Sequence, residues 1–234
     1  MTMIIDLHVH TTRGSGDSSL LPEELVEEAQ RIGLEGACLT EHSGPWDRFE
    51  FHRFTSHHNG VLLIPAMEVE TNVGHITVFG LNSYVPGIRD PKGLRAVADE
   101  MDAYVVLAHP FRNLLQHIPN NLNNNLLFKD TGRRPQTAEE AADHPIFDLI
   151  DAIEVANGAT ISAENALAVE VAQLLGKPMV GGSDAHSANG LGCCVTVFPK
   201  PITSVEEFMY ALHLGDFYPA TGLPGGRLKP VCER

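Results

Sequence analysis

Twelve histidines stand in this chain of 234 residues, and several of them pair with acidic residues in short motifs. His8 and His10 are separated by one residue, as are Asp184 and His186. In an extended chain the side chains at i and i+2 point the same way, so each pair can face one metal ion. Imidazoles and carboxylates are side chains that bind divalent metal ions in proteins. The spacing therefore indicates metal chemistry.

The elements that must position these side chains are short apolar strands. The predicted strands cover 3–7, 36–40, 61–67, 104–108, 152–156 and 178–182, with two more at 74–80 and 193–198. Helices are predicted at 22–32, 91–101, 162–175 and 205–214. This alternation indicates βα units and a largely parallel sheet. The first six strands each place a histidine or an acid at or near the C-terminal end, where barrel enzymes assemble their sites.

Length and composition indicate a folded chain with a full core. The chain is 43% hydrophobic, and barrels of this length often form one domain, so we expect a single domain over 1–234. An irregular, asparagine-rich insertion at about 113–145 is expected to be either a lid or disordered. No apolar run reaches the ~18 residues of a membrane span. The N-terminus lacks the basic segment of a signal peptide, so we expect a cytoplasmic protein.

The net charge of −14 bears on the partners. An acidic chain repels a long phosphate backbone, so we expect no duplex nucleic acid as a partner. Because no apolar run is long enough to span a bilayer, we expect no membrane partner either. A small phosphorylated substrate is expected instead, because local cations or metal ions can reverse the field inside one cleft. The four cysteines show no CxxC spacing and are expected to be reduced. Nothing in the sequence indicates the oligomeric state.

Five motifs follow one another along the chain. They are Asp6-Leu7-His8-Val9-His10-Thr11, Leu39-Thr40-Glu41-His42, Glu68-Val69-Glu70, Ala108-His109-Pro110 and Gly182-Ser183-Asp184-Ala185-His186. In this order they resemble the PHP (polymerase and histidinol phosphatase) family of metallophosphoesterases, from Asp6 to about Gly222. The resemblance implies an α/β fold, a distorted TIM-like (β/α)7 barrel with the metal site at the C-terminal ends of the strands. It also implies two or three divalent metal ions, Zn, Mn or Fe.

The resemblance proposes specific metal ligands. They are His8, His10, Asp17, His42, Glu68, His75, His109, Asp184 and His186. Glu68 is expected to bridge two ions, since a carboxylate has two oxygens. Asp17 follows a loop longer than is common in the family, so it is either a ligand or the start of a turn with Ser18 and Ser19. Glu41, Glu154 and Asn157 either orient ligands or water, or cap strand-end backbone.

The implied activity is that of a phosphoric ester hydrolase in which a metal-bound hydroxide attacks phosphorus. Glu68, Asp184 and Arg112 are expected to be catalytic. Arg112 and Arg13 are candidates for binding the substrate phosphate, or are ordinary surface arginines. The substrate would be a nucleotide, a short oligonucleotide or a metabolite phosphate such as histidinol phosphate. His52 and His144 are further candidates for substrate contacts.

Two alternatives to the phosphoesterase remain open. Amidohydrolase barrels also begin with HxH on the first strand, but they typically finish with a lone strand-end aspartate, whereas Asp184 is followed by His186. A non-catalytic, metal-binding regulatory module is the second alternative. Missing ligands would indicate such a module, and none is obviously missing here.

Overall fold

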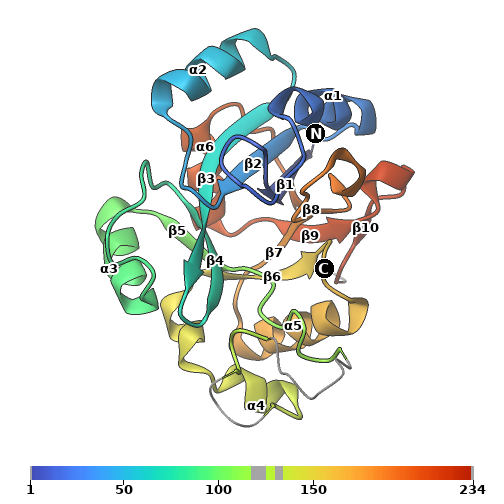
Figure 1. Cartoon of the computed structure of the whole chain (residues 1–234). Coiled ribbons are helices and arrows are strands. Elements are labelled where there is room, and N and C mark those ends of the chain that lie inside the picture. Colours follow the sequence, from blue (N-terminus) through green and yellow to red (C-terminus); the bar gives the residue numbers. More distant parts are fainter. Residues whose placement is uncertain (1, 117–124, 130–133, 233–234) are drawn as a thin grey trace.

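The computed structural model describes residues 2–116, 125–129 and 134–232 (Figure 1). The helices are α1 (Pro22–Ile32), α2 (Arg48–His57), α3 (Pro91–Met101), α4 (Ala138–Ala142), α5 (Ser162–Leu175) and α6 (Val205–Leu214). The strands are β1 (Met3–Val9), β2 (Gly36–Glu41), β3 (Leu62–Thr71), β4 (Gly74–Phe79), β5 (Tyr104–Leu107), β6 (Ala152–Asn157), β7 (Met179–Gly182), β8 (Cys194–Phe198), β9 (Tyr218–Thr221) and β10 (Lys229–Pro230). Three short 3₁₀ helices, η1 (Pro145–Leu149), η2 (Ala188–Gly190) and η3 (Leu223–Gly225), complete the described elements.

All ten strands form one curled sheet in the order β10-β9-β8-β1-β2-β3-β4-β5-β6-β7, with the helices around it (Figure 1). β1, β2 and β3 are parallel, and so are β5, β6 and β7. β4 is antiparallel to both of its neighbours, and β8 and β9 are antiparallel as well. The expected distorted TIM-like α/β barrel is confirmed, with antiparallel departures at β4 and β8–β10.

The sheet curls until the end of β1 meets the chain after β7. The backbone N–H of Asp184 donates to the carbonyl of His8 at 2.7 Å, and that of His10 donates to the carbonyl of Ala185 at 3.0 Å. Below this seam, Thr196 on β8 exchanges side-chain hydrogen bonds with the Gly181 backbone, 2.9 Å in each direction. The closure therefore brings together the two segments that carry the HxH and DxH motifs.

Local sequence explains the helices beside the sheet. Pro22 begins α1, where its missing N–H costs nothing, and Gly33 ends α1 in the left-handed conformation. The predicted helices at 22–32, 91–101, 162–175 and 205–214 are confirmed. α2 was not predicted; Asp47 caps it by accepting hydrogen bonds from two backbone N–H groups, and α2 itself has no buried residue.

The expected insertion at 113–145 contains α4 and the start of η1 in its described part. Its segments 117–124 and 130–133 lie outside the described residues, and so does the question of a lid or disorder there. Among the residues that the structure describes, no helix is long and apolar enough to cross a membrane.

Candidate metal centre

Glu68 lies at the centre of a cluster of imidazoles and carboxylates. It comes from β3, and its side chain is 2% exposed. Its Oε1 lies 3.0 Å from both His75 Nδ1 and His109 Nε2, and 3.4 Å from His8 Nε2. Its Oε2 lies 3.4 Å from both His10 Nε2 and His42 Nδ1. Five imidazoles on four different strands or strand ends thus surround one carboxylate.

β1 aims His8 and His10 into this cluster as the period of two requires. Both side chains are buried, and their Nε2 atoms lie 3.0 Å apart. His8 Nδ1 lies 2.9 Å from Glu154 Oε1, and His10 Nδ1 lies 3.1 Å from Ser15 Oγ. Each ring therefore has one nitrogen fixed by a neighbour and the other turned toward the centre.

The segment after β7 brings the remaining carboxylate. Asp184 Oδ1 lies 3.3 Å from His10 Nε2 and 3.6 Å from His8 Nε2. Asp184 and His109 both have left-handed backbones, with φ of 56° and 29°. Such conformations are strained for residues with a side chain, and they concentrate at functional sites.

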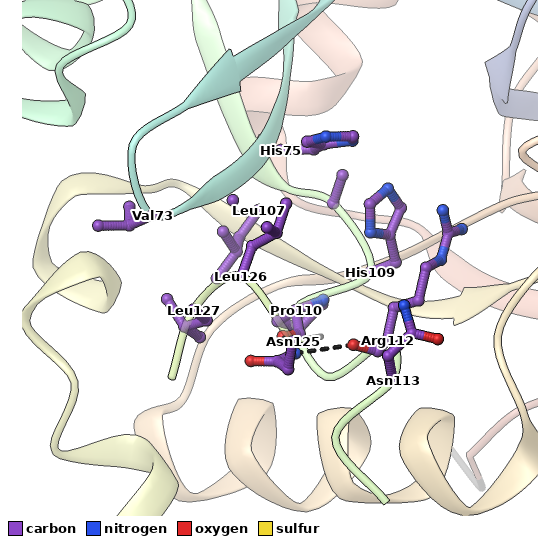
Figure 2. A pocket seen from close by; sticks show the side chains of 12 residues that line it. Val73, His75, Leu107, His109, Pro110, Arg112, Asn113, Asn125, Leu126 and Leu127 are labelled. Atoms are coloured by element: carbon purple, nitrogen blue, oxygen red, sulfur yellow. Dashed lines mark hydrogen bonds between the residues drawn. The ribbon is translucent and has the colours of Figure 1, made fainter. Parts of the chain in front are cut away.

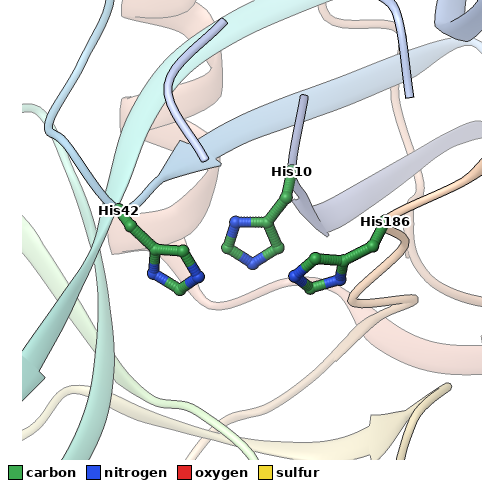
Figure 3. A group of neighbouring side chains, drawn as sticks. All are labelled: His10, His42 and His186. Atoms are coloured by element: carbon green, nitrogen blue, oxygen red, sulfur yellow. The ribbon is translucent and has the colours of Figure 1, made fainter. Parts of the chain in front are cut away.

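Asp17 and His186 form the solvent side of the cluster. Asp17 Oδ2 lies 3.3 Å from His186 Nε2 and 3.4 Å from His42 Nε2. The rings of His42 and His186 each stack on His10 with centroids 4.4 Å apart (Figure 3). The side chain of Asp17 is 59% exposed, so it closes the cluster at the mouth.

The nine residues proposed as ligands are thus all brought together. Four groups of side chains have ligand atoms within 4.8 Å of one another: His10, His42 and His186; His8, His10 and Asp184; Glu68, His75 and His109; and His8, His109 and Glu154. His42 Nδ1 is buried and has no hydrogen-bond partner among the described residues. An unpaired imidazole nitrogen beside buried carboxylates fits a divalent cation.

Charges within the cluster are strongly coupled. Burial by itself would raise the pKa of Glu68, but the surrounding histidines, first His8, hold that pKa well below its usual range. Burial alone would also raise the pKa of Asp184, but His8, His10, His109 and Arg112 hold that pKa well below its usual value. For His8 burial lowers the pKa, and the carboxylates of Glu154, Asp184 and Glu68 raise it well above normal. Both central carboxylates are therefore anionic and available to a cation.

Glu154 and Asn157 on β6 hold the cluster from behind. Besides its contact with His8, Glu154 accepts the backbone N–H of His109 through Oε2 at 2.8 Å. The Asn157 amide donates to the same oxygen at 2.9 Å and to Asp184 Oδ2 at 3.4 Å. Both residues thus fix the positions of proposed ligands, and Glu154 also caps a strand-end backbone N–H.

Glu41 is linked to the cluster through Ser15, which lies beside His10. It accepts hydrogen bonds from the Thr11 N–H and hydroxyl, from Ser15 Oγ at 2.7 Å and from Trp46 Nε1 at 3.0 Å. Ser15 in turn lies beside His10 Nδ1. Glu41 therefore fixes the loop after β1 and, through Ser15, the ring of His10.

Asp6 is a structural residue of the site that we did not predict. Its carboxylate accepts backbone N–H groups from Ser183 at 2.8 Å, Gly192 at 3.0 Å and His8 at 3.2 Å. Burial raises its pKa to about 6, although these hydrogen bonds lower it. The sequence did hold a signal, because Asp6, His8 and His10 follow the period of two on one face of β1.

The two candidate phosphate-binding arginines differ in position. Arg112 Nη2 donates to Asn157 Oδ1 at 2.8 Å and also pairs with Asp184 Oδ2, so Arg112 is at the cluster. Arg13 pairs with Glu50 of α2 instead. His52 lies exposed on α2, and His144 Nδ1 accepts the Ile146 N–H at the start of η1. The structure therefore places Arg112 at the edge of the cluster, where it contacts Asp184. Arg13, His52 and His144 lie away from the cluster.

Comparison with known proteins gives matches to two family profiles and to one curated protein, and a shared fold with solved structures. The sequence profile of the PHP domain family matches residues 6–152, and the PHP-associated profile matches 162–217. A 46-residue segment is 46% identical to an error-prone DNA polymerase of Nocardia farcinica, and the match covers 20% of this chain and 4% of that polymerase.

Solved structures share the fold. A two-domain protein from Bacteroides vulgatus with a predicted PHP-like metal-dependent phosphoesterase aligns with TM-score 0.66 and 22% identity, over 94% of this chain and 64% of that one. A putative metal-dependent phosphoesterase from Bifidobacterium adolescentis aligns with TM-score 0.59 and 15% identity, over 89% and 95%. Endonuclease Q, in complex with a 27-mer duplex carrying an abasic lesion at the active site, aligns with TM-score 0.54 and 18% identity, over 91% and 57%.

The last of these structures corrects one prediction. We expected that duplex nucleic acid is excluded, and that exclusion is wrong, because endonuclease Q has this fold and holds a duplex at its active site. The reasoning failed because net charge is a sum over the whole surface, whereas binding depends on the local field at one face.

Proposed function

Because the chain belongs to the PHP domain family, we propose that it is a metal-dependent hydrolase of phosphate esters. The observation that carries this proposal is the convergence of five imidazoles on the two oxygens of Glu68. A buried carboxylate surrounded by so many imidazoles has no purely structural need for them. It does suit a centre in which Glu68 is shared between cations.

The residues present would hold two or three divalent ions of zinc, manganese or iron. One group is His10, His42 and His186 with Asp17 at the mouth, and another is Glu68, His75 and His109. A third is His8, His10 and Asp184. When bound, such ions would lower the pKa of water and neutralise charge on the phosphoryl oxygens.

The chain's own side chains contribute orientation and charge. The guanidinium of Arg112 is a quarter exposed and would donate to a phosphoryl oxygen beside Asp184. Glu154 keeps His8 Nδ1 occupied, so that Nε2 faces the centre. Glu68 and Asp184 remain carboxylates, as their lowered pKa values require. We propose Glu68, Asp184 and Arg112 as the residues most directly involved in catalysis.

Metal loading followed by a substrate screen tests this function. The chain is stripped with chelator, reloaded separately with Zn²⁺, Mn²⁺ or Fe²⁺, and assayed with mononucleotides, histidinol phosphate, a single-stranded oligonucleotide and a duplex with an abasic lesion. We expect hydrolysis of at least one phosphate ester, lost on chelation and restored by metal. An Asp184→Asn variant serves as the control for contaminating phosphatases.

The alternatives give different results in the same screen. Hydrolysis of amide substrates without any phosphate ester would indicate an amidohydrolase. Stoichiometric metal binding with no turnover of either class would indicate a regulatory module. Turnover that survives exhaustive chelation contradicts the proposal.

A further inference from the structure

A small apolar cavity opens beside the metal centre (Figure 2). Its volume is about 220 Å³, and two proposed ligands, His75 and His109, form one side of it. Its far side is aliphatic, with Val73 at the β3–β4 turn, Leu107 at the end of β5 and Leu126 from the segment 125–129. Of the twelve described residues that line it, none is acidic.

The wall opposite the metal centre is fixed by one buried amide. Asn125 is 2% exposed, and its Nδ2 donates to the carbonyl of Pro110 at 2.8 Å and to that of Arg112 at 2.9 Å. Its Oδ1 accepts the Phe128 N–H at 3.0 Å. Asn125 therefore joins the segment 125–128 to the loop that carries His109 and Arg112, and the cavity is preformed.

The cavity lies where the organic group of a bound phosphate ester could enter it. A phosphoryl group bound by Arg112 beside the proposed ligands His75 and His109 would have its ester oxygen directed either to the open mouth or into this cavity. Leu126, which lines this cavity, is 40% exposed. Covering it with an apolar group would remove this surface from water.

We propose that this cavity is the subsite for the organic group of the ester, and that this group is uncharged and mainly apolar. The inference rests on the proposed phosphoesterase function and adds the class of alcohol that the site selects. Arg112 is the one permanently charged residue among the described lining residues, and it stands at the phosphate end. An ester whose alcohol carries a charge would leave that charge without a partner in the cavity.

Binding of alkylphosphonates tests the subsite without requiring turnover. Calorimetry on the Mn²⁺-loaded protein compares methyl-, propyl- and pentylphosphonate, which differ only in apolar length. We expect affinity to rise about fourfold for each methylene that enters the cavity, until the cavity is full. In parallel, kcat/KM is measured for ethyl, butyl and hexyl phosphate, whose leaving groups have similar acidity.

A filling variant and a matched control locate the effect. Leu126→Trp should flatten the dependence on chain length, because the indole occupies the cavity. Leu214→Trp, at a leucine that is 57% exposed on α6, should keep the dependence. Affinity that does not change with length in the wild type, or a dependence that survives in Leu126→Trp, overturns the subsite.

The two proposals fail in different ways. If phosphonate affinity rises with length but no phosphate ester is hydrolysed, the subsite stands and the proposed function falls. If esters are hydrolysed without any dependence on chain length and phosphonate affinity is flat, the function stands and the subsite falls.

Discussion

Gly182 lies so close to His8 that a Cβ at position 182 would be 2.3 Å from the His8 Cβ. That added Cβ at position 182 would also be 2.7 Å from Glu154 Oε1. This contact occurs because the end of β7 closes against β1 at the proposed metal centre. Only glycine, which has no side chain, allows β7 and β1 to lie this close together.

Replacing Gly182 should therefore damage both fold and site. Gly182→Ala should lower the free energy of unfolding by about 1–3 kcal/mol, since the added methyl group overpacks a closed seam. It should also lower the metal content, because His8 must move. Gly225→Ala is the matched control, because nothing lies within 4 Å of a Cβ there. Denaturant unfolding and metal analysis measure both effects, and equal stability of the two variants would contradict the contact.

Neutralising the carboxylate of Glu68 should reduce metal binding and activity more than neutralising that of Asp17. Glu68 contacts five imidazoles and is buried, whereas Asp17 contacts two and is exposed. Glu68→Gln should lose more bound metal and more kcat/KM than Asp17→Asn. Glu70→Gln is the control, because Glu70 also lies on β3 but is exposed and pairs with Arg89 instead of with the histidines of the cluster. Equal losses at positions 68 and 17 would argue against a shared, bridging carboxylate.

Arg112 should matter for both substrate and stability. Arg112→Ala should raise KM and lower kcat, with a combined loss of about 1.5–3 kcal/mol from the missing charge-assisted hydrogen bond. The variant also leaves Asp184 without its guanidinium partner, so the metal-free protein should unfold more easily. Arg89→Ala, at an exposed arginine paired with exposed Glu70, is the control. Unchanged kinetics in the Arg112 variant would remove its assigned role and leave the metal proposal intact.

Asp6 should contribute stability without contacting substrate. In Asp6→Asn an amide N–H would face a backbone N–H where the carboxylate now accepts one, so the loss should be about 1–3 kcal/mol. Asp216→Asn, at an exposed aspartate, should change stability by less than about 0.5 kcal/mol. Thermal unfolding of the metal-free proteins measures the difference. An Asp6 variant as stable as the Asp216 variant would contradict this role.

The sequence predicted the positions of the strands better than their directions. Alternating apolar runs and helices specify βα units, but the run 74–80 follows β3 after only two residues, too few for a parallel crossover. β4 is therefore antiparallel, and the short spacing could have indicated it. The nine proposed ligands came from the resemblance to the PHP family. Strand-end motifs pointed to seven of them, but not to Asp17 in a loop or to His75 near the start of β4. α2 was missed because its apolar residues, Phe49 among them, do not form a buried face.

Other parts of the site depend on contacts that no local pattern encodes. Asn125, within the insertion, donates to the carbonyls of Pro110 and Arg112, and Thr196 contacts Gly181 below the seam. Such pairs become visible only when the sheet has curled. The single-domain organisation and the roles of the individual ligands stay predictions.

Because the proposed ligands lie on both sides of the seam between β1 and β7, bound metal ions would also affect how the barrel folds and how stable it is. His8 and His10 lie on one side of the seam, and Asp184 and His186 lie on the other, so about three quarters of the chain separates the two halves of the proposed centre in sequence. During synthesis the first strand must therefore wait for β7 and the segment after it before the proposed ligand set is complete. Once bound, a cation would clamp the first strand to the segment after β7, and backbone amides at the seam would exchange with solvent slowly. Metal occupancy would then govern how long the folded barrel survives, as well as what it can do.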